Sequence, residues 1–204
     1  MKCVNLSNID LALNCAEQDN MGGLTPRVIF GYHEDVEVWP DFPTVGAGEQ
    51  AVEMEAAGKL VGSIVMKEGT HAYAFEFDEN VGSFTVAPQG EAGAVSFLYT
   101  LIIISRRIRA LVFGFLNAAK NRKMFFIVQD SNGELYLMGD KRRGAMLVAS
   151  DGATTGTAAT DVNQSNLQFQ YTSPRALVYT GDTDELLTDA DDGTDDDSNE
   201  PVMP

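Results

Sequence analysis

The chain has 204 residues, of which 44% are hydrophobic and 9% aromatic, enough to bury the core of one ordinary domain. This composition excludes a disordered or fibrous protein. Thirty acidic side chains stand against fourteen lysines and arginines, for a net charge of −16, which disfavours binding to DNA or to anionic lipids. The longest apolar run, residues 95–104, contains Ser96 and Thr100 and is about half as long as a membrane-spanning helix.

The N-terminal segment differs from a secretory signal. Asn5, Asn8 and Asp10 interrupt the stretch that a signal peptide keeps apolar, so we expect no cleaved leader. The two cysteines, Cys3 and Cys15, could form a disulfide if this segment folds back on itself. Without a secretion signal we favour two reduced, buried thiols.

Charge is distributed along the chain in blocks. Residues 1–105 carry a net charge of −11, residues 106–143 carry +6, residues 144–181 carry −1 and residues 182–204 carry −10. The last block has no aromatic residue and is rich in Asp, Gly, Thr and Ser. We therefore predict one β-rich domain over residues 1–181, followed by a disordered acidic tail over residues 182–204.

The first half of the chain favours strands. Residues 73–77 alternate aromatic side chains with Ala74 and Glu76, which is the period-two pattern of a half-buried strand. Residues 94–104 are apolar at both odd and even positions, so we expect a central strand there. The strands expected in this half cover residues 27–32, 58–67, 72–78, 83–87 and 94–104.

The next element is a helix over about residues 106–120. Apolar residues recur there at spacings of three and four and predict one buried stripe, formed by Ile108, Leu111, Val112, Phe115 and Ala119. Ser105 is placed to cap the first turn, because its side-chain oxygen can accept a hydrogen bond from a free amide. The early arginines would oppose the helix dipole, so we expect an acidic neighbour to compensate them.

The strongest local signal is a β-hairpin. Residues 124–130 and 135–139 flank Asn132-Gly133, a dipeptide typical of a type I′ turn, in which both central residues have positive φ. Further strands are expected at 145–150, 166–172 and 176–180. About nine strands and one helix predict a mainly β fold, an antiparallel sandwich or barrel with one flanking α-helix.

No motif indicates catalysis. The sequence lacks a phosphate-binding loop, a nucleophile elbow and paired metal-binding cysteines. His33 stands beside Glu34 and Asp35, but side chains alternate in direction along a strand, so we interpret this cluster as a solvated strand end. We expect no enzymatic activity, no metal and no cofactor.

Two short basic clusters are candidates for contacts between copies of the chain. Neither has the interleaved aromatic residues of a nucleic-acid site, and both belong to a strongly acidic protein, so acidic surface on another copy is the partner we expect. The candidate contact residues are Arg106, Arg107, Arg109, Lys141, Arg142 and Arg143.

The C-terminal half resembles the tail-tube-like virion proteins of bacteriophages, especially those that infect Bacteroidetes bacteria. The resemblance lies in residues 101–104, the helix, and the stretch 121–139 with the sequence NRKMFFIVQDSNGELYLMG. It continues through Thr155-Gly156-Thr157, Asp161, Asn163, Leu167 and Phe169, and extends more loosely to Cys3, Cys15 and Gly22-Gly23. It covers residues 95–180 well and carries no catalytic residues.

The resemblance implies a β-sandwich subunit of the virion, made in the cytoplasm of the host bacterium. Such subunits form hexameric rings that stack into a tube, contact other tail or neck proteins, and let the genome pass without binding it. An acidic tail is not a feature of that group, so a head–tail connector or capsid decoration protein is an alternative. A carbohydrate- or receptor-binding β-sandwich is the alternative from another class, although the single Trp39, between Val38 and Pro40, offers no aromatic cluster.

Overall fold

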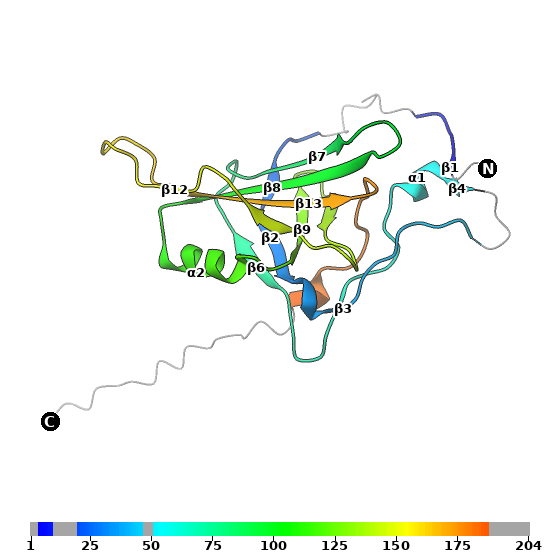
Figure 1. The fold of residues 1–204 in the computed structure, drawn as a ribbon, viewed down its shortest axis with the longest axis horizontal. Coiled ribbons are helices and arrows are strands. Elements are labelled where there is room, and N and C mark those ends of the chain that lie inside the picture. Colours follow the sequence, from blue (N-terminus) through cyan, green and yellow to red (C-terminus); the bar gives the residue numbers. More distant parts are fainter. Residues whose placement is uncertain (1–3, 10–19, 47–50, 188–204) are drawn as a thin grey trace.

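Two antiparallel sheets face each other in the computed structural model, which describes residues 4–9, 20–46 and 51–187 (Figure 1). The four-stranded sheet has the order β10 (Leu135–Met138), β9 (Met124–Asp130), β2 (Leu24–Tyr32) and β6 (Tyr73–Glu76). The five-stranded sheet has the order β11 (Met146–Val148), β13 (Gln164–Ser173), β8 (Ser96–Arg106) and β7 (Ser83–Gln89), with β12 (Ala153–Thr154) also paired to β13. The mainly β sandwich that the sequence predicts is therefore confirmed.

The remaining elements are short, apart from one helix. Helix α2 (Ala110–Ala119) packs beside β6 and β2 (Figure 1). Two small sheets pair β1 (Val4–Asn5) with β4 (Val52–Glu53) and β3 (Val36–Val38) with β5 (Val65–Met66). The other helical turns are α1 (Met54–Ala57), η1 (His33–Asp35) and η2 (Asp184–Leu187).

The main core lies between the two sheets. Every second residue of β13 and β8 points inward, and the register pairs Leu167 with Ile103 and Phe169 with Leu101. Phe126 of β9 meets Phe169 with ring centroids 4.5 Å apart. The pairing confirms that β8 is a central strand, since β13 and β7 flank it.

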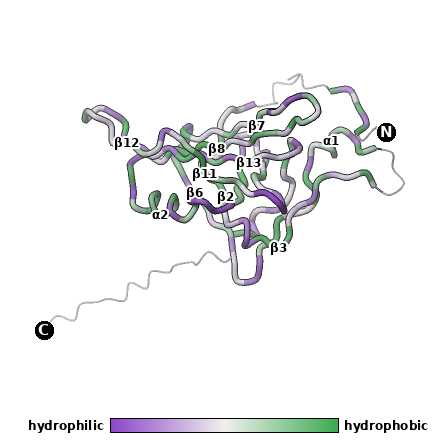
Figure 2. Tube along the Cα trace, viewed as in Figure 1, coloured by the Kyte–Doolittle hydropathy of each residue, from purple (hydrophilic) through white to green (hydrophobic). Residues whose placement is uncertain are grey.

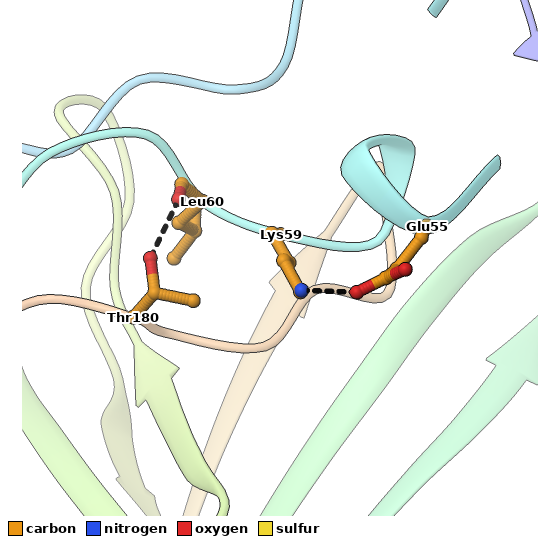
Figure 3. A network of polar contacts seen from close by, with 4 residues as sticks. All are labelled: Glu55, Lys59, Leu60 and Thr180. Atoms are coloured by element: carbon orange, nitrogen blue, oxygen red, sulfur yellow. Dashed lines mark hydrogen bonds and ion pairs between the residues drawn. The ribbon is translucent and has the colours of Figure 1, made fainter. Parts of the chain in front are cut away.

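A second core covers the opposite face of the four-stranded sheet. Phe125 and Ile127 of β9 point into it, so β9 is buried on both faces and reads as a continuous apolar run. The layer over them consists largely of irregular segments, including residues 58–72 and 177–187. Thr180 donates to the carbonyl of Leu60 at 3.2 Å and joins these two segments (Figure 3).

This second core explains two wrong strand predictions. Residues 58–67 form a strand only at β5, and residues 176–180 form isolated bridges but no strand. Their apolar side chains fill the second core from loops, where burial does not require a strand. Tyr179 shows the arrangement, because its ring is buried and its hydroxyl accepts a hydrogen bond from the Ile64 amide at 3.1 Å.

Helix α2 begins later than the sequence predicts, at Ala110. Ser105 does not cap it, because Ser105 and Arg106 continue the β8 ladder and pair with β13. Arg107 then turns the chain with a φ of +68°, and its amide donates to the carbonyl of Asn163 at 2.7 Å. The later start of α2 keeps Ser105 and Arg106 in strand β8. There they add two residue pairs to the ladder with β13, the longest ladder among the described strands.

The hairpin is present, but its turn is not type I′. Gly133 has a φ of +93°, whereas Asn132 is not among the described residues with positive φ, so the loop has three residues, 131–133, closed by the Asp130 amide donating to Glu134. The Asp130 carboxylate accepts from the amides of Asn132 and Glu134, both at 2.9 Å. This side chain favours a type I turn followed by a glycine bulge.

The domain boundary predicted at residue 181 is also corrected. Residues 182–187 belong to the folded body, since Leu186 is only 4% exposed and its carbonyl accepts from the Ala72 amide at 3.0 Å. The rest of the predicted tail, residues 188–204, lies outside the described residues, as do Cys3 and Cys15.

The hairpin turn generates the first prediction. Gly133→Val should lower the free energy of unfolding by about 1–3 kcal/mol, because a β-branched residue is strained at positive φ. A Cβ at this position would meet nothing within 4 Å, so the loss reports backbone strain and not a clash. Urea denaturation measures it, and Gly133→Asn is the control, since Asn tolerates this region. Equal stability of the two variants would contradict the turn assignment.

The second prediction concerns the corrected boundary. Leu186→Ala should lower the free energy of unfolding by about 2–5 kcal/mol, because it removes a buried side chain from the second core. Val162→Ala, at a side chain that is 60% exposed, is the matched control and should change stability little. Chemical denaturation measures the free energy of unfolding of both variants. An unchanged free energy of unfolding in Leu186→Ala would restore the domain boundary at residue 181.

Candidate interaction surface

The six predicted contact residues lie in two separate places. Arg106, Arg107 and Arg109 connect β8 to the start of α2, and all three are exposed. Lys141, Arg142 and Arg143 form an exposed turn after β10. The chain from Arg109 through α2 to Lys123 links the two groups, since Lys123 contacts Arg142.

The second group is part of a larger basic corner, which we define as Lys120, Arg122, Lys123, Lys141, Arg142 and Arg143. The Lys123 ammonium donates to the carbonyl of Arg142 at 3.3 Å, and a bridge between Met124 and Ala145 holds the two segments side by side. All six side chains belong to exposed residues. Sequence reasoning identified only half of this corner, because nothing local in the sequence places residues 120–123 against 141–143.

Asp140 fixes the shape of the turn at the basic corner. One of its carboxylate oxygens accepts from the amides of Arg142 and Arg143, at 2.7 and 2.9 Å. The other accepts from the Tyr171 hydroxyl at 2.7 Å. Both carboxylate oxygens of Asp140 therefore accept hydrogen bonds from within the fold. The basic side chains of the same turn, residues 141–143, remain exposed.

Tyr171 anchors this turn to the main core. Burial raises the pKa of its phenol far above the usual value, and the hydrogen bond to Asp140 and the charge of that carboxylate raise it further. The neutral phenol is therefore the form that the fold holds, and it donates to Asp140 throughout the ordinary pH range.

His33 also supports the turn, through a hydrogen bond and a ring contact. Its Nε2 lies 2.7 Å from the Asp140 carbonyl oxygen, which can only accept, so Nε2 carries the proton. Its ring stacks on Trp39 with centroids 4.7 Å apart. The interpretation of residues 33–35 as a solvated strand end is therefore wrong for His33, which joins η1 to the turn.

Helix α2 presents an apolar surface that the sequence analysis missed. Val112 and Ala119 are buried, and Phe115 packs on Phe30 with ring centroids 5.0 Å apart. Leu111, predicted to lie in the buried stripe, is 82% exposed, and Phe113 is 45% exposed. The signal was available, because residues 110–119 contain no charged side chain and α2 is hydrophobic along most of its length (Figure 2).

An apolar cleft of about 220 Å³ lies between α2 and β6. Phe30, Phe75, Phe115 and Leu111 line it, together with the charged residues Glu76 and Arg109. Strand β6 is an edge strand of the four-stranded sheet, so its outer side has no partner strand among the described residues. The cleft adjoins both the exposed side of α2 and the edge strand, since Leu111 of α2 and Phe75 of β6 both line it. Exposed apolar side chains and an unpaired strand edge are features of protein-binding surfaces.

The acidic neighbour expected for the early arginines is present for one of them. Arg106 forms a salt bridge with Asp78 at 3.3 Å, although from the end of β8 and not from a helix. Both side chains are more than half exposed, so the pair contributes little to stability. Its effect is to lower the net positive charge at this end of α2, where Glu76 also lies.

Other kinds of site find no support in the described part of the chain. A cavity of about 780 Å³ is lined by Asp41 and Glu53, among others, and the Glu53 carboxylate accepts a hydrogen bond from the Asn5 side-chain amide at 2.7 Å. Within residues 4–9, 20–46 and 51–187, no three His, Cys, Asp or Glu side chains gather as a metal site would require. No helix in these ranges is long and apolar enough to cross a bilayer.

The third prediction follows from the Tyr171 phenol. In the unfolded chain this phenol loses its proton near pH 10, whereas in the folded chain it keeps it to a higher pH. The unfolded state therefore binds fewer protons above about pH 10, and stability should fall as pH rises through that range. Tyr171→Phe should lower the free energy of unfolding at pH 7 by about 1–3 kcal/mol and flatten this alkaline fall.

Denaturation curves between pH 7 and 11 measure both effects. Tyr73→Phe is the control, because that side chain is 49% exposed. An identical alkaline slope in wild type and Tyr171→Phe would contradict the role given to the buried phenol.

Comparison with known proteins yields no match. No family model matches the chain, and neither does any curated protein or solved structure. Function must therefore be inferred from the sequence and from the geometry of the chain itself.

Proposed function

We propose that this chain is a structural subunit that binds copies of itself to form rings, of the kind that stack into a bacteriophage tail tube. The channel of such a tube carries the genome. The partners are other copies, in a ring that the resemblance implies to be hexameric, and neighbouring tail or neck proteins. The protein acts within the virion after synthesis in the host cytoplasm, and DNA passes it only transiently.

The observation that carries the proposal is the character of the surface around α2. An exposed basic corner lies beyond one end of an exposed apolar helix face, on a chain whose net charge is −16. In a ring, one surface of each copy meets a different surface of the next copy. Opposite charges on those two surfaces favour this head-to-tail contact over random association, and the apolar face supplies the contact with buried area.

The fold is compatible with this function. A β-sandwich with one flanking helix is what the resemblance over residues 95–180 implies for a tail-tube subunit. The acidic excess suits a channel for nucleic acid, because carboxylates repel phosphates and a wall of Lys and Arg would bind them. We therefore propose that the face of the ring that lines the channel is net negative.

The fourth prediction tests self-assembly. Wild-type protein should form ring-sized oligomers, and Lys141→Glu with Arg142→Glu should weaken them while the thermal midpoint of the monomer changes little. Arg143 is left in place because its guanidinium donates to the Thr172 carbonyl at 3.5 Å. Sedimentation velocity and negative-stain electron microscopy, at low and moderate salt, provide the measurement.

The matched control changes the net charge equally at another place. Arg27→Glu with Lys59→Glu reverses two exposed basic side chains distant in sequence from the basic corner and should leave assembly intact. Lys59 pairs with the exposed Glu55, in a surface ion pair that contributes little to stability. A wild-type protein that stays monomeric under every condition, also with tail-initiation partners present, would overturn the ring proposal. Equal loss of assembly in both variants would show that net charge, and not the basic corner, governs association.

A further inference from the structure

The acidic residues 188–204 and the basic corner have complementary charge within one chain. Residues 188–204 contain seven acidic side chains and no basic one. The basic corner presents six basic residues on the surface, and the nearest acidic group, Asp140, is already bound by backbone amides and Tyr171. Glu34 and Asp35 of η1 are the other acidic residues on an element that contacts this corner.

A series of contacts links the end of η2 to the turn of the basic corner. The Leu186 carbonyl accepts from the Ala72 amide at 3.0 Å, and the Thr70 hydroxyl donates to the Asp35 carbonyl at 3.2 Å. His33, two residues before Asp35, contacts the Asp140 carbonyl at 2.7 Å. Summed along these contacts and the residues between them, the path from the end of η2 to the turn is roughly 40 Å, and the seventeen residues that follow Leu187 can span roughly 55 Å.

We propose that residues 188–204 bind to the basic corner of the same chain. Tethering gives the segment an effective concentration in the millimolar range at this site, so its own corner outcompetes that of another copy at micromolar protein. Several carboxylates facing several cations give a contact that is strong at low salt and is lost when salt shortens the range of electrostatic interaction.

The other basic group of the surface is the weaker site. Arg106 is already paired with Asp78, and Glu76 lies in the same cleft beside Arg109. An acidic segment that approached the three arginines would also meet the carboxylates of Asp78 and Glu76. In the turn of the basic corner the one carboxylate, Asp140, instead binds the buried Tyr171. The two basic groups therefore differ in how much of their positive charge nearby carboxylates already balance. The arginine group is balanced more than the basic corner.

This contact is independent of ring formation, but it bears on the proposed function. If the ring uses the basic corner, the acidic segment and a neighbouring copy compete for one surface.

Paramagnetic relaxation in the full-length monomer tests the proposal. A nitroxide is attached to Ser198→Cys in a chain that carries Cys3→Ser and Cys15→Ser, and amide intensities are compared with the reduced label. We expect the amides of residues 122–123 and 141–143 to lose at least half of their intensity, and those of residues 106–109 to lose little. The loss should disappear in 1 M NaCl, where the Debye length is about 3 Å.

Two charge-reversal variants localise the contact. Lys141→Glu with Arg142→Glu should abolish the broadening, and the matched pair Arg107→Glu with Arg109→Glu should preserve it. Well-dispersed amide spectra confirm that each variant is folded. A mixture of spin-labelled ¹⁴N protein and unlabelled ¹⁵N protein detects binding between copies.

Four results would overturn the proposal: no broadening at the corner, equal broadening at residues 106–109, persistence of the effect in 1 M NaCl, or broadening of equal strength in the mixed sample. All four are measured on the monomer, so they are separate from a failure to assemble into rings.

Discussion

Burial of β9 on both faces is the constraint on which the rest of the structure depends. Phe126 and Val128 face β8 and β13 across the sandwich, whereas Phe125 and Ile127 face away from it. A single sheet partner cannot cover both sets, so the protein needs a second layer over the outer side of the four-stranded sheet. Segments from three distant parts of the chain supply that layer, and one of them holds η1 against the turn of residues 140–143.

The features predicted correctly from the sequence are those with local causes. The central strand β8 is marked by a run that is mostly apolar at both odd and even positions, and the hairpin is marked by Asn132-Gly133 between two β-rich runs. The turn type was wrong because it depends on the Asp130 side chain, which holds two amides of the loop. The start of α2 was wrong because the ladder between β8 and β13, a pairing across sixty residues, outweighs the capping tendency of Ser105.

The candidate surface could be predicted only in part for the same reason. Lys141, Arg142 and Arg143 stand out in any count of charge, but their neighbours Lys120, Arg122 and Lys123 join them only through the bridge between Met124 and Ala145. The direction of the apolar stripe on α2 depends on where Phe30, Phe75 and Phe169 lie beneath it. Since those aromatic residues come from three separate strands, periodicity alone could not decide that Leu111 faces outward.

The anchoring of Asp140 has a consequence for how the basic turn acts on its surroundings. A loop held by a buried tyrosine, a histidine and two of its own amides has lost its conformational freedom before any partner arrives. The entropy of ordering this loop is therefore part of the folding free energy and not of the binding free energy. Tyr171 and His33, neither of which belongs to the basic corner, thus help to determine the affinity of the surface for whatever it contacts.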